Sequence, residues 1–434
     1  MDSDLPHELV AAISELWRKA PSVGEQLSES TSFQQLIGMC VRLYPDVIGE
    51  VGRDGARRPD RDGIGAALRH AFIATGAPWL ARTRFDKDPL SIPLVAAEID
   101  RAFRAKSTTV VHLCPLDRGA NIPSVHFDIC KINEFSTDAL EDLVHAPRLA
   151  RRGIAFDSKK FARIKWLVVR ETVELPKPVG ARAIPILYQI VDWNITVQPH
   201  EAKYPIPVER ALFTLLLAEW ERAVGKNEFD WRPFRVPWVY TFTDDPFAAA
   251  PVFPDAESLS WEHRGYTDDA TGELVEYEVP YTTNMDDAVV GALMAELPSL
   301  AELVNKTCSA SCINPLVRHF LIRAFTSDGI DELLFHTLTI EAALGREEER
   351  QGILAKLKER IRRLTGRHDA GGEFAIQYDR RSTYIHGRNM QELEREDLIA
   401  ARKLAREVAF HLVCRAADNP HLGRDEFLNQ LEPA

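Results

Sequence analysis

The sequence predicts an α+β protein, in which a mixed region of helices and strands is followed by a C-terminal all-α bundle. Several segments before residue 243 alternate apolar and polar residues with period two, which is typical of strands. From residue 289 onward the apolar residues recur at helical spacing almost throughout. An acidic stretch that contains prolines lies between the two patterns and marks the change of architecture.

The first region opens with apolar spacings that fit four helices, at residues 8–19, 33–49, 64–82 and 93–105. Strands are expected in four later segments, at residues 125–130, 161–175, 186–197 and 238–243. In 186–197 the alternation shifts by one residue, as a β-bulge would require. Pro207 and Gly225 are the start and stop signals of a strongly apolar helix between the last two strands.

The acidic stretch predicts the domain organisation. Residues 244–287 contain twelve acidic residues and one basic residue, which leaves a net charge of about -1 for the rest of the chain. Four prolines and little helical periodicity favour an irregular connector. We therefore expect an N-terminal α+β domain over 1–243 with a sensing role, a connector over 244–288, and a helical bundle over 289–434.

The bundle region divides into six expected helices, at residues 289–304, 314–326, 329–345, 347–365, 375–387 and 393–417. The last helix has the clearest pattern, since its apolar residues follow 3,4,3,4 spacing. They are Leu398, Ala401, Ala405, Val408 and Leu412. This stripe is expected to pack inside the bundle or against a second copy of the chain.

Composition excludes several functional classes. No run approaches the ~20 apolar residues of a membrane span, and the first residues lack the pattern of a signal peptide, so we expect a cytoplasmic protein without a membrane partner. The six cysteines are scattered, and only Cys308 and Cys312 lie close in sequence. This spacing, without a second pair, predicts neither a zinc site nor disulfides. No phosphate-binding loop is present, and no cofactor is expected.

The formal net charge of -12 argues against a nucleic-acid partner, but one segment of the chain is basic. Residues 356–388 contain nine basic and four acidic residues, a local net charge of +5. Such a patch suits RNA binding, through Arg363, Arg380 and Arg388 in particular. The alternative is a solvated helix face with no ligand.

The segment Arg381–Gly387 carries the most informative chemistry. It places an arginine, the Ser382 hydroxyl and the His386 imidazole around one turn of a helix, with Gly387 as a natural terminus. The bare spacing of arginine and histidine occurs three times in the chain, also at Arg363/His368 and Arg406/His411. His411 lies inside the last helix, and His368 follows a helix end among flexible glycines, so the Arg381/His386 pair is favoured.

These residue types suit RNA cleavage without a metal. Attack of the ribose 2'-hydroxyl on the adjacent phosphate needs a base, an acid and positive charge at the phosphorane. Histidine titrates near neutrality, and guanidinium binds phosphate oxygens bidentately. Because one His386 does not comfortably serve as both acid and base, we expect a C2 dimer that joins two Arg381/His386 pairs. The alternative is an ordinary ion pair of Arg381 with Asp379 or Glu373, with His386 capping the helix.

Arg381–Gly387, together with Leu338–Leu344 upstream, resembles the HEPN superfamily and particularly its ApeA-like branch. The similarity covers roughly residues 315 to 417. Phe161–Arg170 and Val208–Leu217 are loosely similar to the regions that accompany such domains. The resemblance implies a dimerising helical bundle, metal-independent endoribonuclease activity, and a role in antiphage defence by abortive infection or in a toxin-like system.

What the resemblance implies for single residues is specific. Arg381 and His386 would be catalytic, with Ser382 as the polar residue after the arginine, where many relatives have asparagine, histidine or aspartate. From the residues themselves, Glu341 is expected to orient the motif by pairing with Arg381, with an ordinary helix-surface acid as the alternative. Tyr384 is expected to pack rather than to stack on a base. The substrate would be RNA, with transfer RNA as our expectation, and a phage or host trigger would act on the N-terminal domain. A non-catalytic nucleic-acid- or protein-binding module, or a toxin–antitoxin component, is the alternative.

Overall fold

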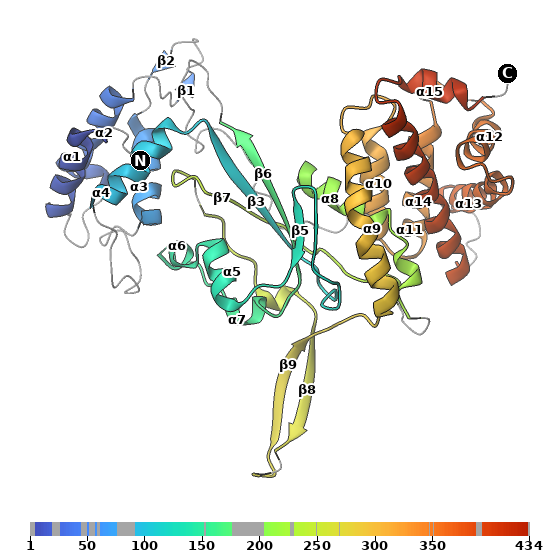
Figure 1. Cartoon of the computed structure of the whole chain (residues 1–434), viewed down its shortest axis with the longest axis horizontal. Helices are drawn as coiled ribbons and strands as arrows, with labels where there is room; N and C mark the ends of the chain where they lie inside the picture. Colours follow the sequence, from blue (N-terminus) through green and yellow to red (C-terminus); the bar gives the residue numbers. More distant parts are fainter. Residues whose placement is uncertain are drawn as a thin grey trace.

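The computed structural model places the N-terminal helices, an antiparallel sheet and a C-terminal helical region in succession across the molecule (Figure 1). This confirms the predicted α+β class. The structure describes residues 5–19, 27–44, 50–51, 57–58, 61–75, 92–151, 153–175, 204–225, 230–248, 250–268, 270–346, 348–349, 351–387 and 393–432.

Four helices form a separate small core at the N-terminal end of the molecule. They are α1 (His7–Arg18), α2 (Thr31–Leu43), α3 (Arg61–Thr75) and α4 (Ile92–Arg104). Each has an apolar face at helical spacing; in α1 it is Leu9, Ile13 and Leu16, all fully buried. A short two-stranded ribbon, β1 (Glu50–Val51) with β2 (Arg57–Arg58), lies in this region.

A five-stranded antiparallel sheet follows, in the order β4-β5-β6-β3-β7. Its strands are β3 (Ser107–Pro115), β4 (Val125–Phe127), β5 (Cys130–Asn133), β6 (Trp166–Glu174) and β7 (Tyr240–Thr243). The two long strands pair along their whole length, with His112 opposite Val169. Segment 125–130, expected as one strand, is instead a hairpin, because Asp128 has φ 49° and turns the chain.

Alternation along the strands gives the sheet two buried faces. On one face Val111, Leu113 and Trp166 pack under the short helices α5 (Thr137–Val144), α6 (Ala146–Arg151) and α7 (Ser158–Phe161). On the other face Cys114, Leu167 and Val169 join a larger core. Burial on both sides explains why these strands are so apolar.

Helix α8 (Ile206–Leu216) lies between the sheet and the helical bundle (Figure 1). It starts as predicted, with Pro207 in its first turn, but it ends at Leu216 rather than near Gly225. A 3₁₀ turn at Trp220–Arg222 continues the chain, and the Trp220 indole donates a hydrogen bond to the Leu215 carbonyl at the helix end. The strand expected at 186–197 lies outside the described residues.

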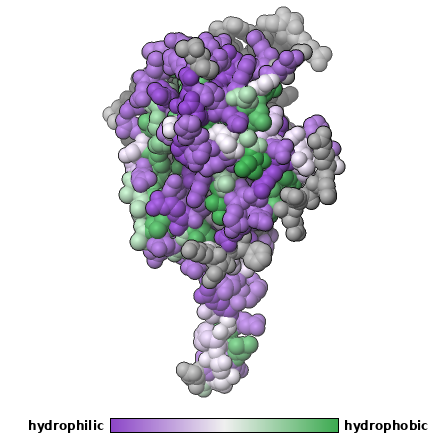
Figure 2. All heavy atoms as spheres, turned by 90° about the vertical axis from the view of Figure 1, so that its right-hand side faces the viewer, coloured by the Kyte–Doolittle hydropathy of each residue, from purple (hydrophilic) through white to green (hydrophobic). Residues whose placement is uncertain are grey.

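The expectation of an irregular connector is wrong for much of 244–288. After a 3₁₀ turn at Ala256–Ser258, strands β8 (Trp261–Thr267) and β9 (Leu274–Pro280) form an antiparallel hairpin. The hairpin stands clear of the body in both views (Figure 1, Figure 2). Val275, Tyr277 and Val279 do alternate with acids, so the period-two signal was present but masked by the density of charge.

The C-terminal region is helical, as predicted. Its helices are α9 (Asp287–Lys306), α10 (Pro315–Phe325), α11 (Gly329–Leu344), α12 (Ile353–Thr365), α13 (Ala370–Ile385), α14 (Arg395–Asp418) and α15 (Arg424–Gln430). In α14 the residues from Ala401 to Leu412 of the predicted stripe are fully buried. Helix α13 begins five residues before the expected position 375, so Gly371 and Gly372 belong to its first turn rather than to a loop.

One hydrophobic core joins the sheet to the bundle. It includes Leu167 and Val169 of β6, Leu212 of α8, Ile340 of α11 and Val408 of α14. The expected boundary near 288 matches the start of α9, yet apolar packing is continuous across it. The C-terminal helices are therefore not a separate packing unit.

Within the described ranges, no helix combines the length and apolarity required to cross a bilayer.

Candidate functional site

The end of α13 presents His386 to solvent. The helix finishes at Ile385, and the backbone N–H of His386 donates to the Ser382 carbonyl at 3.1 Å. Gly387 follows with φ 60°, the left-handed conformation in which glycine is favoured as a helix terminus. His386 and Ile385 are exposed, while Ser382 and Tyr384 are half-buried. The sequence motif thus forms a helix end with an accessible imidazole.

Arg381 is held against the bundle by two neighbours. Its Nη1 lies 3.3 Å from Oε1 of Glu341 on α11. The side chain of Arg381 is 21% exposed and that of Glu341 is 20% exposed. Its guanidinium also lies 5.5 Å from the ring centroid of Tyr378, one helical turn earlier. The alternative ion pairs with Asp379 or Glu373 do not form; Glu373 pairs with Arg367 instead.

The contact between Arg381 and Glu341 is an ion pair without a hydrogen bond. Glu341 Oε1 and Arg381 Nε are both buried and lack hydrogen-bond partners within the described part of the chain. Burial raises the pKa of Glu341, and the charge of Arg381 only partly opposes this. The guanidinium is therefore positioned by charge and packing, while its buried Nε–H has no hydrogen-bond partner within the described part of the chain.

Within one chain, Arg381 and His386 point to different sides of α13. Five residues on an ideal helix turn the side chain by about 140°. Arg381 faces α11, whereas His386 is at the exposed end, and no contact between the two side chains is found in the described ranges. One copy of the chain therefore does not assemble the pair by itself.

The basic patch is largely neutralised by ion pairs. Arg363 binds Glu359 at 2.6 Å and donates to the Glu432 carbonyl, and Arg380 pairs with Asp397. Other basic residues of the patch also pair with carboxylates, as seen for Lys356, Arg360, Arg362 and Arg367. Arg388 lies outside the described residues. An RNA phosphate would therefore compete with existing partners at Arg363 and Arg380.

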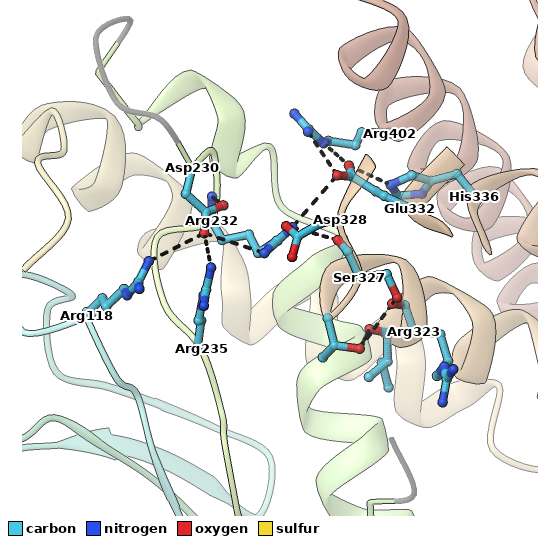
Figure 3. Close-up of polar contacts among 12 residues, drawn as sticks. Arg118, Asp230, Arg232, Arg235, Arg323, Ser327, Asp328, Glu332, His336 and Arg402 are labelled. Atoms are coloured by element: carbon cyan, nitrogen blue, oxygen red, sulfur yellow. Dashed lines mark hydrogen bonds and ion pairs between the residues drawn. The ribbon is translucent and has the colours of Figure 1, made fainter. Parts of the chain in front are cut away.

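A second polar cluster lies between the α+β region and the bundle, with Arg232, Glu332 and Arg402 buried and Asp328 exposed (Figure 3). Arg232 donates to the Ser327 carbonyl at 2.6 Å and to Asp328, which lies just before α11. Within the bundle, Glu332 of α11 accepts hydrogen bonds from Arg402 of α14. The Arg402 guanidinium also stacks 4.1 Å from the ring centroid of Trp231. The cluster ties segment 230–236 to two helices of the bundle.

His336 lies at the inner end of this cluster (Figure 3). Its side chain is 3% exposed, and its Nε2 lies 3.5 Å from Glu332 Oε1 without forming a hydrogen bond. Burial lowers the pKa of His336 despite the nearby carboxylate. Burial of Glu332 disfavours its charged form, which by itself would raise the pKa of Glu332. The contacts with His336 and Arg402 favour the charged form more strongly, so the pKa of Glu332 is lowered. Sequence reasoning missed these residues, because their polar character inside helices gave no periodic signal.

In the described part of the chain, no three histidine, cysteine, aspartate or glutamate side chains gather as metal ligands would. Comparisons with protein-family models, with curated proteins and with solved structures find no match to this chain.

Proposed function

We propose that this chain is a metal-independent endoribonuclease of the HEPN type, whose site is completed by a second copy. The main support for this proposal is the way in which the Arg381 side chain is held. It is held by Glu341, its buried Nε–H has no hydrogen-bond partner within the described ranges, and it lies on the helix that ends with the exposed His386. An arginine prepared in this way suits a phosphate, and an exposed histidine suits proton transfer.

The chemistry assigns each residue a role. Arg381 would bind the oxygens of the scissile phosphate and stabilise the phosphorane. One His386 would take the proton of the 2'-hydroxyl, and His386 of the second copy would protonate the departing 5'-oxygen. The products would be a 2',3'-cyclic phosphate and a 5'-hydroxyl. Ser382, half-buried one turn before His386, would contact the phosphate or the imidazole.

The need for two copies follows from the geometry of one. Arg381 and His386 lie on different sides of α13, so a cleft between two α13 helices is the simplest way to bring both residue types to one phosphate. Ile385, next to His386, is 52% exposed and would be covered by such an interface. We therefore propose the end of α13 as the homodimer contact.

The test compares the wild-type chain with Arg381→Ala and His386→Ala. His411→Ala is the matched control, because Arg406/His411 has the same spacing but lies within α14. RNA cleavage should fall at least about 100-fold in the two site variants and stay unchanged in the control. Cleavage should persist in chelator and leave cyclic-phosphate termini. Equal RNA patterns in all four proteins would exclude the nuclease function.

The same geometry also favours a second candidate, a non-catalytic module that binds nucleic acid or protein. Such a module would not require Arg381 and His386 to contact the same phosphate, which agrees with their separation in one chain. In that case His386→Ala would retain both RNA binding and the cellular phenotype. Phage plating on cells that carry each variant would also test the proposed role in antiphage defence, with transfer RNA as the first substrate to examine.

A further inference from the structure

A groove in the described bundle lies between α12 and the first turns of α13. Its volume is about 880 Å³, and Lys358, Arg362, His368 and Tyr378 contribute to its walls. This groove surrounds the histidine that sequence reasoning set aside as part of a flexible loop. Because α13 already begins at Ala370, His368 instead sits just before a helix.

Two glycines with different surroundings lie beside the groove. A Cβ on Gly371 would lie 2.8 Å from the Lys358 carbonyl oxygen, so glycine permits the close approach of α12 and α13 there. A Cβ on Gly372 would meet nothing within 4 Å, so a side chain at that position would project into open space. Gly371 is thus buried against α12, whereas Gly372 leaves exposed backbone at the edge of the groove.

The charged side chains of the groove favour an anion. Lys358 is exposed and has no carboxylate partner in the described part of the chain. Glu359 is the one acidic residue lining the groove, and its carboxylate accepts hydrogen bonds from Arg362 and Arg363. These contacts lower the pKa of Glu359 to about 2. Its charge is therefore compensated by the two arginines. His368 is exposed and adds a further hydrogen-bonding group.

Tyr378 connects this groove to the candidate catalytic arginine. Its ring lines the groove and also lies 5.5 Å from the guanidinium of Arg381. Phe374 packs against the same ring, with centroids 5.8 Å apart, and limits its movement. A strand whose phosphate is bound at Arg381 would therefore place its neighbouring nucleotide at the mouth of this groove.

We propose that the α12–α13 groove is a subsite for single-stranded RNA, which holds the nucleotide next to the cleaved phosphate. A base would lie against Tyr378, while Lys358 and His368 would contact the backbone phosphate. Single-stranded RNA is specified because only an unstacked base can reach an aromatic ring in a groove. The proposal rests on the proposed function, since it takes Arg381 as the site of the scissile phosphate.

Binding tests the subsite separately from cleavage. The full chain carrying His386→Ala would be titrated against a labelled single-stranded RNA of about twelve nucleotides and against its duplex, using fluorescence anisotropy over a series of salt concentrations. In that background Lys358→Ala should weaken binding severalfold and reduce the salt slope by about one. Tyr378→Leu should weaken binding about tenfold, and Tyr378→Phe should bind like the parent.

Lys403→Ala is the matched control, because Lys403 is an exposed lysine that lines a different groove of about 520 Å³ on the same bundle. Thermal unfolding of each variant checks that the fold is kept. The subsite is excluded if Lys358→Ala and Tyr378→Leu bind like the Lys403→Ala control, if no variant binds RNA, or if the duplex binds as well as the single strand. If the groove variants lose RNA binding but the wild-type chain does not cleave RNA, the nuclease function is rejected and the RNA-binding groove is kept.

Discussion

Glu341 Oε1 and Arg381 Nη1 lie 3.3 Å apart between α11 and α13, in an ion pair that forms no hydrogen bond. Each helix is fixed in the bundle by its own apolar face, through Ile340 on α11 and Phe374 on α13. The ion pair therefore contributes more to the position of the Arg381 guanidinium than to the stability of the fold.

The first prediction follows from this contact. Burial raises the pKa of Glu341, so replacing its carboxyl by an amide in Glu341→Gln should change the free energy of unfolding by less than about 1 kcal/mol. RNA cleavage should nevertheless fall about tenfold, because Arg381 loses its positioning charge. Chemical denaturation and cleavage rates are measured on one preparation, with Glu302→Gln on the exposed face of α9 as control. Parallel losses of stability and cleavage would contradict the positioning role.

A second prediction concerns the proposed dimer. If both copies supply a histidine to one cleft, a mixed dimer of wild type and His386→Ala should be inactive. Equal amounts of the two chains, co-expressed or exchanged, should then leave about a quarter of the wild-type cleavage. Independent sites would leave about half, and size-exclusion chromatography with light scattering would report the assembly directly.

The buried cluster makes a third prediction, about stability. Arg402→Met should lower the free energy of unfolding by about 3 kcal/mol, since the buried Glu332 carboxyl would lose the two hydrogen bonds that Arg402 donates to it. Adding Glu332→Leu should restore much of the loss, because an apolar pair leaves no unpaired charge. Urea denaturation measures both variants. Arg101→Met, whose side chain is 64% exposed, is the matched control and should have little effect.

The fourth prediction is a pH dependence. Hydrogen bonds from Arg360 lower the pKa of Glu349 to about 2, against burial. The unfolded chain has the ordinary value of about 4.3, so between these two values the unfolded state binds more protons. This contribution to stability is complete above pH 4.3 and is lost as the pH falls towards 2. Glu349→Gln should cost about 2 kcal/mol at pH 7 and progressively less below pH 4.

Thermal unfolding between pH 7 and pH 3 checks this difference. Glu426→Gln, an exposed position on α15, should follow the wild-type curve at all pH values. A constant gap between Glu349→Gln and wild type down to pH 3 would contradict the assignment to Glu349.

A fifth prediction concerns the β8–β9 hairpin. Tyr266 and Leu274 near its tip are 55% and 65% exposed, so they contribute little burial to the fold. Replacing 264–277 by a short glycine–asparagine turn should change the free energy of unfolding by less than about 1 kcal/mol. The contact of Lys160 with Glu278 at the base of the hairpin is retained. A loss of several degrees in Tm would mean that the tip packs against another part of the molecule.

Elements with local signals were predictable from the sequence. The buried faces of α1 and α14 follow their apolar spacing, and β6 follows its run of apolar residues. The hairpin at 261–280 was missed because neither of its faces is fully buried and its alternating apolar residues stand among many acids, which hides the period-two pattern. The early start of α13 was missed because Gly371 and Gly372 have low helix propensity, which packing against α12 overrides.

The sequence by itself therefore determined the α+β class, the helical C-terminal region and the motif that places Arg381 and His386 near one helix end. Only the tertiary structure decided which charges meet. It neutralises much of the basic patch, as in the pair of Arg380 with Asp397, and joins Glu332 to Arg402 across 70 residues of sequence. The physical reason is that backbone periodicity is local, whereas the partner of a charged side chain depends on which helices pack together.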